Sequence, residues 1–297
     1  MTKYSNGVRK AVIPAAGLGT RFIPYTKSQP KEMIPLIDRP TIQYVVEEVI
    51  SSGIETICII DSRGKSAIRH HFDETSDRLR KALEARGKYD DIERLERLAS
   101  IGDKICYVNQ PSPDGLGGAV LCAKKWIDDE PFALLLGDDI IASDMPATRQ
   151  LLQVYDSVRK PVIAVEHVEN VSAYGIVDRG KKVRGLDRAH YIKKLVEKPK
   201  PSEAPSDMGI VGRYILEPSI FAYLEGIRSV NGEKQLTDAM QRSLEVRGSK
   251  GIVAYEFKGK RIDTGTPFSW LTANIDMALE DPEMGPKITE FMKRKVA

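Results

Sequence analysis

The sequence has few cysteines and no long apolar run. Its three cysteines, Cys58, Cys106 and Cys122, are far apart and form no Cys-x-x-Cys pair, which disfavours a disulfide framework and a zinc site. Each lies in an apolar stretch, so we predict buried free thiols in a reducing compartment. No apolar run approaches the roughly 18 residues of a membrane span, and the first residues lack the apolar core of a signal peptide. These absences predict a cytoplasmic protein with no membrane partner.

The sequence also lacks a marked excess of charge of either sign. Lys and Arg number 45 and Asp and Glu 42, which gives a formal net charge of +3. A nucleic-acid-binding surface requires a larger basic excess, so we expect no nucleic-acid partner. The 297 residues are 41% hydrophobic and 29% charged, which is typical of a globular chain that buries a sizeable core.

Short apolar runs alternate with amphipathic stretches over the first half of the chain. Strands are predicted at residues 10–15, 54–61, 104–110, 131–139 and 160–168, and helices at 41–53 and 115–127. This alternation indicates crossover units, and therefore an α/β fold with a Rossmann-like, mainly parallel mixed sheet and helices on both faces. Residues 74–101 are dense in charge with leucines at helical spacing, which predicts a solvated helical hairpin inserted between the second and third strands.

A stretch with almost no side chains, AAGLGT at residues 15–20, follows the first predicted strand. Loops at the carboxyl ends of parallel strands bind ligands in open α/β sheets. Gly17 and Gly19 allow backbone N–H groups to turn inward around an anion. Arg21 then supplies a guanidinium that suits phosphate oxygens, and Lys27 and Lys31 follow in a proline-rich loop. The pattern predicts a polyphosphate site, and a triphosphate fits it best.

Three other interpretations of this loop compete. A dinucleotide fingerprint needs a third glycine where Phe22 stands. A Walker-type loop ends in Gly-Lys-Ser/Thr, whereas Gly19 is followed by Thr20 and Arg21. A glycine-rich turn without a ligand remains open for the loop taken alone.

Two aspartates, Asp138 and Asp139, end the fourth apolar run, LLLGDD. A carboxylate at a strand end beside phosphates is suited to Mg²⁺, which prefers one or two carboxylates together with phosphate and water oxygens. The alternative for Asp138 is a turn residue that accepts local N–H groups. Asp263, in IDTGT, is a second candidate ligand, although taken alone it is more typical of a helix start.

Polar residues at other predicted strand ends could recognise the rest of a substrate. Glu32 is either a counter-ion to the nearby lysines or an acceptor for a base N–H, and the Gln110 amide could read a base edge beside Gly115. Glu197 and Lys198 end a predicted strand, where a carboxylate could bind sugar hydroxyls and an ammonium a phosphate. The alternative is a surface ion pair of little energetic value.

Taken together, these stretches resemble the sugar nucleotidyltransferase family over nearly the whole chain. The resemblance is carried by AAGLGTRFIPYTKSQPKEMIP, TIQYVVEE, GLGGAVLCAK, LLGDDI, YGIVD, VEKPKPSEAPSD, IVGRYIL, GEKQLTDAM and IDTG. Thymidylyltransferases of the family usually have a double glycine where this chain has Ala15 and Ala16, and they lack the charged insertion. Those differences favour the bacterial uridylyltransferases of the family.

The resemblance implies the nucleotide-diphospho-sugar transferase fold in one domain. Its parts would be a nucleotide-binding half at 8–168 that carries the insertion at about 74–101, a sugar-binding half at 169–265, and C-terminal helices at 266–297. The implied activity is Mg²⁺-assisted in-line attack of glucose 1-phosphate on the α-phosphorus of UTP, which yields UDP-glucose and pyrophosphate. A homodimer or homotetramer is the implied assembly.

The resemblance also implies a role for each candidate residue. Arg21, Lys31 and Asp138 would be catalytic, and Asp138 with Asp263 would be the metal ligands. The nucleotide would be bound by Ala15, Ala16, Gly17, Gly19, Glu32, Gln110 and Gly115. The sugar phosphate would be bound by Gly175, Glu197, Lys198 and Gly212.

The chain departs from the family pattern at three places. Asp207 stands where the family often has Asn, Lys234 stands in place of an apolar residue, and TPFSW at 266–270 differs from the usual sequence after DTG. These departures leave sugar specificity and subunit contacts open. Two rival functions also stay open: thymidylyl or another nucleotidyl transfer, and a regulator that binds nucleotide sugars without turnover.

Overall fold

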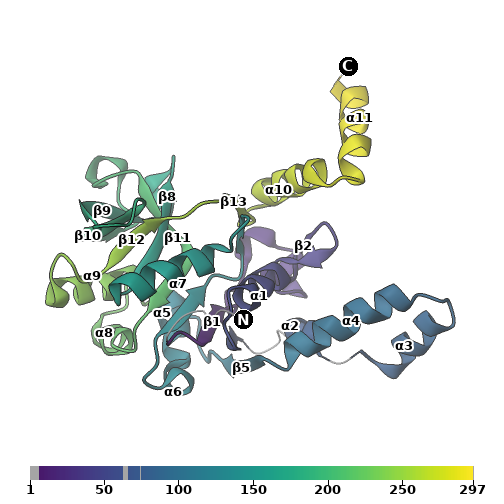
Figure 1. The fold of residues 1–297 in the computed structure, drawn as a ribbon, viewed down its shortest axis with the longest axis horizontal. Helices are drawn as coiled ribbons and strands as arrows, with labels where there is room; N and C mark the ends of the chain where they lie inside the picture. The colour runs from purple at the N-terminus through teal and green to yellow at the C-terminus, as the bar shows by residue number, and fades with distance from the viewer. Residues whose placement is uncertain (1–6, 63–65, 74, 297) are drawn as a thin grey trace.

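The buried β-branched runs of the chain pair into a nine-stranded mixed sheet in the computed structural model, which describes residues 7–62, 66–73 and 75–296 (Figure 1). The strand order is β5-β4-β1-β6-β11-β8-β12-β10-β9. The bounds are β1 (Lys10–Pro14), β4 (Thr56–Asp61), β5 (Ile105–Asn109), β6 (Phe132–Leu135), β8 (Val162–His167), β9 (Gly175–Lys182), β10 (Ala189–Glu197), β11 (Met208–Leu216) and β12 (Val253–Glu256). Two short pairs lie outside the sheet: β2 (Pro35–Leu36) with β3 (Arg39–Pro40), and β7 (Asp139–Ala142) with β13 (Lys260–Asp263).

The two halves of the sheet differ in strand direction. β5, β4, β1 and β6 run parallel, as the alternating sequence predicts. β11 then runs antiparallel to both β6 and β8, and β10 runs antiparallel to β12 and β9. The predicted α/β class with a mixed sheet is confirmed: the half that begins the chain is all parallel, and in the other half β8 and β12 are the one parallel pair among the described strands. Since the carboxyl ends of parallel strands meet at one edge, β1, β4, β5 and β6 deliver their following loops to the same place.

Helices cover both faces of the sheet, as predicted. They are α1 (Thr41–Ser51), α2 (Ser66–Phe72), α3 (Asp77–Glu84), α4 (Tyr89–Gly102), α5 (Gly115–Cys122), α6 (Lys124–Ile127), α7 (Ala147–Val158), α8 (Ile220–Gly226), α9 (Leu236–Arg247), α10 (Pro267–Glu280) and α11 (Met284–Val296). One buried cluster joins the sheet to α1 and α7, and a second joins it to α5, α8 and α9. The sequence patterns used above did not single out α7 or α8.

The charged insertion is the predicted helical hairpin. α3 and α4 lie between β4 and β5 and extend away from the sheet together with α2 (Figure 1). α3 has no buried residue and α4 buries only Ile92, so most of the charge is solvated. Residue 74, the first of the predicted insertion, lies outside the described residues.

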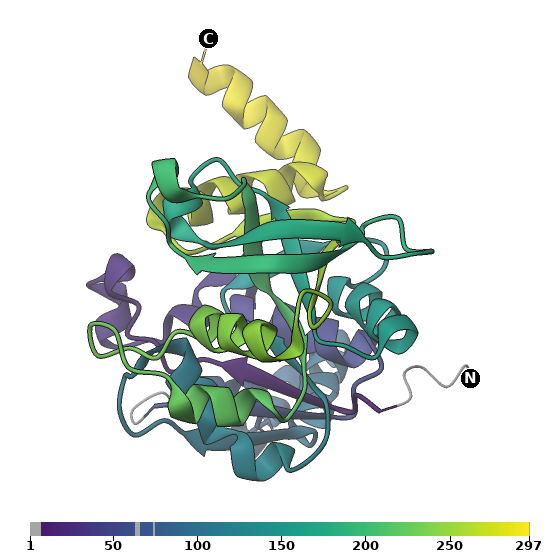
Figure 2. The same ribbon diagram turned by 90° about the vertical axis from the view of Figure 1, so that its left-hand side faces the viewer.

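The C-terminal segment forms α10 and α11, and α11 projects from the body of the molecule (Figure 2). Within the described residues, no helix is both long and apolar enough to cross a bilayer. The three cysteines are free thiols, as predicted. Only Cys58 is fully buried, however, because Cys106 lies in the edge strand β5 and Cys122 at the end of α5, where both keep part of their surface in solvent.

Candidate active site

The glycine loop leaves the end of β1 and carries a left-handed residue at Gly19. Ala15 and Ala16 are buried, and the Ala15 N–H donates to the Ile60 carbonyl at 2.7 Å, which anchors the start of the loop. Gly19 has φ 63°, and a Cβ there would lie 2.9 Å from Thr26 Cγ2. Glycine is therefore required at 19 both by its backbone angle and by the close approach of the following turns.

Three short 3-10 turns then bring Lys31 back beneath the loop. They are η1 (Thr20–Phe22), η2 (Tyr25–Lys27) and η3 (Lys31–Met33). A Cβ placed on Gly17 would lie 3.5 Å from Lys31 Cε, so the lysine stem passes under the glycine. The next residue, Glu32, is 1% exposed. The loop and the lysine motif, adjacent in sequence, thus form one surface.

Lys31 forms an ion pair with Asp138, which lies 107 residues further along the chain. Burial disfavours charge on both groups, but their mutual attraction outweighs it. The pKa of Lys31 is therefore raised, with Glu32 contributing, and the pKa of Asp138 is lowered. Both groups stay charged across the neutral range. Their side chains are still 26% and 28% exposed, so the pair can be reached from solvent.

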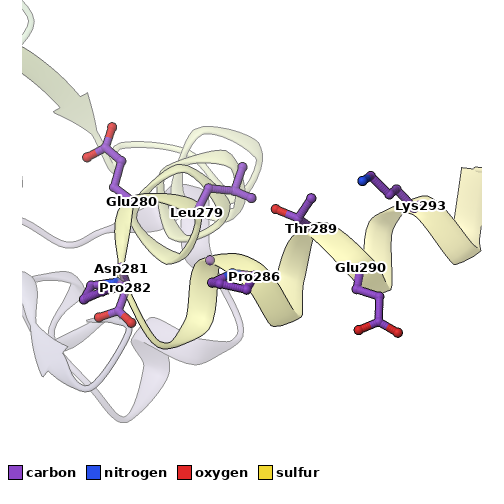
Figure 3. Close-up of a pocket in the computed structure, with 9 residues that line it drawn as sticks. Leu279, Glu280, Asp281, Pro282, Pro286, Thr289, Glu290 and Lys293 are labelled. Atoms are coloured by element: carbon purple, nitrogen blue, oxygen red, sulfur yellow. The ribbon is translucent and has the colours of Figure 1, made fainter.

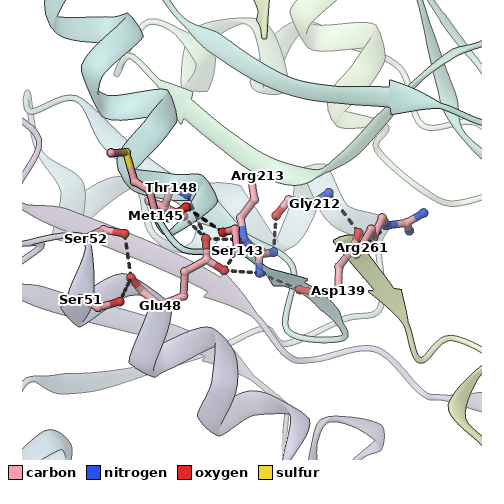
Figure 4. A network of polar contacts seen from close by, with 10 residues as sticks. All are labelled: Glu48, Ser51, Ser52, Asp139, Ser143, Met145, Thr148, Gly212, Arg213 and Arg261. Atoms are coloured by element: carbon pink, nitrogen blue, oxygen red, sulfur yellow. Dashed lines mark hydrogen bonds and ion pairs between the residues drawn. The ribbon is translucent and has the colours of Figure 1, made fainter. Parts of the chain in front are cut away.

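The neighbouring Asp139 is used differently, because its carboxylate is consumed by the fold. Asp139 Oδ1 accepts from Arg261 Nε at 2.7 Å, and Oδ2 accepts from the Gly212 N–H at 3.1 Å (Figure 4). Asp139 is 5% exposed. Of the two adjacent carboxylates, Asp138 is therefore the one that is open to a ligand.

A buried ion pair between Glu48 of α1 and Arg213 of β11 lies beside the acidic corner, which Asp138 and Asp139 form (Figure 4). Arg213 Nη2 donates to a Glu48 oxygen at 2.7 Å and to the Asp139 carbonyl at 2.7 Å. Thr148 of α7 donates to Glu48 through its hydroxyl at 2.6 Å. Burial disfavours the Glu48 carboxylate, but Arg213 outweighs it and lowers the pKa of Glu48. The backbone next to Asp138 is therefore held by α1, α7 and β11 together.

The end of β13 and the residues after it contact Asp138 and Asp139. β13 pairs with β7 so that Asp263 lies opposite Asp139. The Thr264 hydroxyl donates to the Asp138 carbonyl at 2.8 Å, and Arg21 Nη1 reaches the Gly265 carbonyl at 3.5 Å. The two predicted metal ligands and the predicted triphosphate cation thus come from three distant segments to one place.

The predicted base-recognition residues lie where β5 passes into α5. The Gln110 side-chain amide donates to Asp114 Oδ1 at 2.5 Å and lies 3.4 Å from the Gly115 carbonyl. Gly115 has φ 86°, and a Cβ there would lie 2.8 Å from Glu233 Cβ. The structure therefore brings Gln110 and Gly115 together. Sequence reasoning missed Asp114, which orients the Gln110 amide.

The predicted sugar-binding residues meet at the end of β10. Gly175 and Glu197 are register partners, and a Cβ on Gly175 would lie 3.2 Å from Glu197 Oε2 and 2.9 Å from Thr237 Oγ1. Lys198 follows with φ 42°, and its ammonium lies 3.4 Å from Glu197 Oε1. The left-handed backbone turns two adjacent side chains to one side, which an extended strand would not do. Thr237 was not predicted, although QLTDAM contains it.

Gly212 has a structural role that the sequence did not indicate. It lies within β11, and a Cβ there would lie 2.8 Å from Leu136 Cβ and 3.1 Å from Asp139 Cβ. A side chain at 212 would therefore collide with Leu136, which follows β6, and with Asp139, which begins β7. Its predicted position beside the sugar stays a prediction.

Arg261 links the acidic corner to the sugar side, and sequence reasoning missed it. Besides Asp139, its guanidinium contacts Glu166 Oε1 at 3.1 Å and the Tyr174 hydroxyl at 3.0 Å. Burial raises the pKa of Glu166 although Arg261 opposes that shift. The run KGKRID, which ends at Asp263, shows three cations and a strand, but nothing in it indicates which carboxylates they meet.

A cavity of about 510 Å³ lies at the bend between α10 and α11 (Figure 3). It is bounded by Leu279, Asp281 and Pro286 at the bend and by Glu290 and Lys293 along α11. None of the predicted site residues contributes to its lining. The candidate active site lies instead at the carboxyl edge of the parallel strands β1, β4, β5 and β6.

Comparison with known proteins agrees with this arrangement. Residues 10–280 match the family described as Nucleotidyl transferase. The chain is 44% identical over 289 residues to the UTP–glucose-1-phosphate uridylyltransferase of Bacillus subtilis strain 168, and the match covers 96% of each chain. A UTP-bound UGPase from Acinetobacter baumannii superposes with a TM-score of 0.84 at 35% identity and covers 96% of this chain and 98% of its own. A UDP-glucose pyrophosphorylase complexed with UDP-glucose gives 0.80 at 36%, covering 92% of this chain and 100% of its own.

Proposed function

The chain belongs to the nucleotidyl transferase family, and on that premise we propose that it makes UDP-glucose and pyrophosphate from UTP and glucose 1-phosphate. The observation that carries the proposal is the 44% identity, over 96% of both chains, to a curated UTP–glucose-1-phosphate uridylyltransferase. The Lys31–Asp138 pair beneath the glycine loop supports it, because the reaction needs a cation and a carboxylate at the triphosphate.

The residues present fit a Mg²⁺ ion. Within residues 7–62, 66–73 and 75–296, no group of three or more His, Cys, Asp or Glu side chains is placed so that it could hold a metal ion. Mg²⁺ does not require such a cluster, since it is commonly bound through one or two carboxylates together with substrate phosphates and water. Asp138 and Asp263 would hold it, and when bound it would neutralise phosphate charge.

The reaction needs no covalent enzyme intermediate. An oxygen of the sugar phosphate forms a bond to the α-phosphorus of UTP while the bond to the β-phosphate breaks, and pyrophosphate leaves with the electron pair. The barrier lies in bringing two anions together and in stabilising charge on the transferring group. Arg21 and Lys31 would bind the triphosphate, and the backbone of Gly17, which carries no side chain, would approach it closely.

The sugar phosphate would bind at the end of β10. Lys198 would hold its phosphate and Glu197 would accept protons from sugar hydroxyls. Gly175 lets Thr237 and Glu197 come close to the strand, since a Cβ there would lie 2.9 Å from Thr237 Oγ1 and 3.2 Å from Glu197 Oε2. The exposed Lys198 ammonium can leave Glu197 to meet the phosphate at small cost, because exposed ion pairs are weak.

The experiment that tests the proposal is a substrate panel read as pyrophosphate release. UTP and dTTP are each combined with glucose 1-phosphate and galactose 1-phosphate in the presence of Mg²⁺. We expect the highest kcat/KM for UTP with glucose 1-phosphate. Preference for dTTP would replace the proposal by thymidylyl transfer, and binding of UDP-glucose without pyrophosphate release by any pair would indicate a regulator.

We further propose a cytoplasmic homodimer or homotetramer. The free thiols are consistent with a reducing compartment. Light scattering coupled to size-exclusion chromatography measures the assembly, and a mass equal to the 33.1 kDa chain would contradict it.

A further inference from the structure

We propose that Lys234 is a positioning residue for nucleotide recognition, which acts by fixing the first turn of α5 to the end of α8. This inference rests on the proposed function, because it assumes that Gln110 and Gly115 contact the base. Lys234 touches neither the glycine loop nor the acidic corner through any of its hydrogen bonds described below. Its effect on the reaction would therefore pass through the residues that it holds.

The backbone of Lys234 makes two hydrogen bonds with the segment that opens α5. Its N–H donates to the Asp114 carbonyl at 2.7 Å, and its carbonyl accepts from the Gly117 N–H at 2.9 Å. The first N–H groups of a helix have no partner within the helix, so the second bond satisfies one of them. A Cβ on Gly117 would lie 2.7 Å from the Lys234 carbonyl oxygen, so the two segments are in contact.

The side chain of Lys234 anchors the same backbone to α8. Its ammonium donates to the Leu224 carbonyl at 2.9 Å and lies 3.3 Å from the Ile227 carbonyl. These carbonyls belong to the C-terminal turn of α8, where orphan acceptors and the negative end of the helix dipole favour a cation. An apolar side chain at 234 could supply neither hydrogen bond. The segment between α8 and α9 would then lose these two contacts with the end of α8.

The fixed segment includes both predicted base contacts. Asp114, whose carbonyl Lys234 holds, accepts from the Gln110 amide through its carboxylate. Gly115 lies between Asp114 and Gly117 and packs against Glu233, the neighbour of Lys234. A shift of residue 234 would therefore move Gln110 and Gly115 together. The acidic corner is held by Arg213 and Arg261, and the end of β10 is held by its pairing with β9 and by Gln241 of α9, so both would stay in place.

Two substitutions separate this role from a general contribution to stability. Lys234→Met keeps the length and the apolar stem and removes the donors, whereas Lys234→Arg keeps a cation with donors. Lys250→Met serves as the control, since Lys250 is exposed in the turn after α9 and lies outside the proposed site. Each protein is assayed at full length for KM of both substrates and for kcat. Thermal melting and calorimetric Kd for UTP are measured alongside.

We expect Lys234→Met to raise both KM and Kd for UTP about tenfold, the equivalent of one well-placed hydrogen bond to a charged group. The KM for glucose 1-phosphate should stay within about twofold, because that site is held separately. Lys234→Arg should recover most of the UTP affinity, and Lys250→Met should match the wild type.

Three results would overturn the inference. They are unchanged UTP binding in Lys234→Met, an equal rise in KM for both substrates, and UTP affinity in Lys234→Arg as poor as in Lys234→Met although its melting temperature is restored. If the wild type binds UTP but releases no pyrophosphate, the proposed function fails. The ratio of the Kd for UTP in Lys234→Met to the Kd for UTP in the wild type still decides the inference. A wild type that does not bind UTP removes both.

Discussion

Two lysine–carboxylate pairs lie at opposite ends of the candidate site, and they differ in how the fold makes them. Lys31 and Asp138 are 107 residues apart, come from different elements, and lie partly buried. Glu197 and Lys198 are neighbours at the end of β10, and the Lys198 side chain is 54% exposed. The Lys31–Asp138 pair forms only when β1 and β6 lie side by side in the sheet. The Glu197–Lys198 pair needs only the left-handed backbone of Lys198.

The difference suggests different tasks at the two ends. Charge at Lys31 and Asp138 is kept by mutual attraction against burial, and the backbone beside Asp138 is fixed by the Glu48–Arg213 pair. Such preorganised charge suits a centre where charge develops during reaction. The exposed Lys198 ammonium can leave the less exposed Glu197 at little cost, which suits binding of an anion that arrives and leaves.

The largest effect is expected where the support of the first pair is broken. Glu48→Gln leaves Arg213 buried without its carboxylate partner, and loss of one member of a buried pair typically costs about 3–5 kcal/mol. Urea unfolding at pH 7 measures the change in the free energy of unfolding. The control is Glu55→Gln, an exposed glutamate whose ion pair with Arg9 spans 4.0 Å; it should lose less than about 1 kcal/mol.

The pH dependence of this change has a defined sign. Because the pKa of Glu48 in the folded protein lies below its ordinary value of 4.5, its contribution is fully present above that value. The contribution is lost as the pH falls through the lowered pKa. The stability gap between wild type and Glu48→Gln should therefore narrow in acid. A gap that stays constant into strong acid would contradict the assignment.

The next effect concerns the open carboxylate itself. Asp138→Ala should lower kcat/KM roughly 10²–10³-fold, because a preorganised charge at the transferring phosphate is lost. The chain should still fold, since the Asp138 carboxylate is not the one that binds Arg261 and Gly212. Asp144→Ala, an exposed aspartate after β7, is the matched control. Turnover near the wild-type rate at saturating Mg²⁺ would remove Asp138 from the mechanism.

The smallest effect is expected at the exposed Lys198. Lys198→Met should raise the KM for glucose 1-phosphate by roughly tenfold, the equivalent of one charge-assisted hydrogen bond. The KM for UTP should be unchanged, and the free energy of unfolding should change by less than about 1 kcal/mol. Lys200→Met, at a more exposed lysine two residues on, should change neither KM. Equal losses for both substrates would mean that the two ends of the site are not separate.

Each of the three departures from the family pattern makes specific contacts in the fold. Thr266 begins α10 and accepts from the Ser269 N–H at 3.1 Å, and Trp270 Nε1 donates to the Pro35 carbonyl at 2.8 Å. TPFSW therefore fixes α10 against β2. Asp207 accepts from His167 at 2.9 Å on the surface, which lowers the pKa of Asp207. Lys234 holds the end of α8.

Local pattern was enough to predict most of the elements and the chemical type of each candidate residue. Strands follow from β-branched runs, α1 follows from apolar spacing, and the glycine loop follows from Gly17 and Gly19. Of these two glycines, only Gly19 is required by backbone angle and close approach, because Gly17 has no positive φ and a Cβ there would make an ordinary contact with Lys31 Cε at 3.5 Å. Asp138 and Asp139, by contrast, look alike in sequence. Their different uses depend on Arg261 and Gly212, which are more than 70 residues away.

The sequence by itself determined the α/β class, the glycine loop and the residue types proposed to meet phosphate, since each depends on a few neighbouring residues. Only the tertiary structure decided that Lys31 pairs with Asp138, that Asp139 is consumed by the fold, and that Lys234 joins α5 to α8. Those contacts form when distant strands and helices pack together, and no spacing along the chain encodes them. The contacts of Asp139 with Arg261 and Gly212 also leave Asp138 as the carboxylate that is open to a ligand.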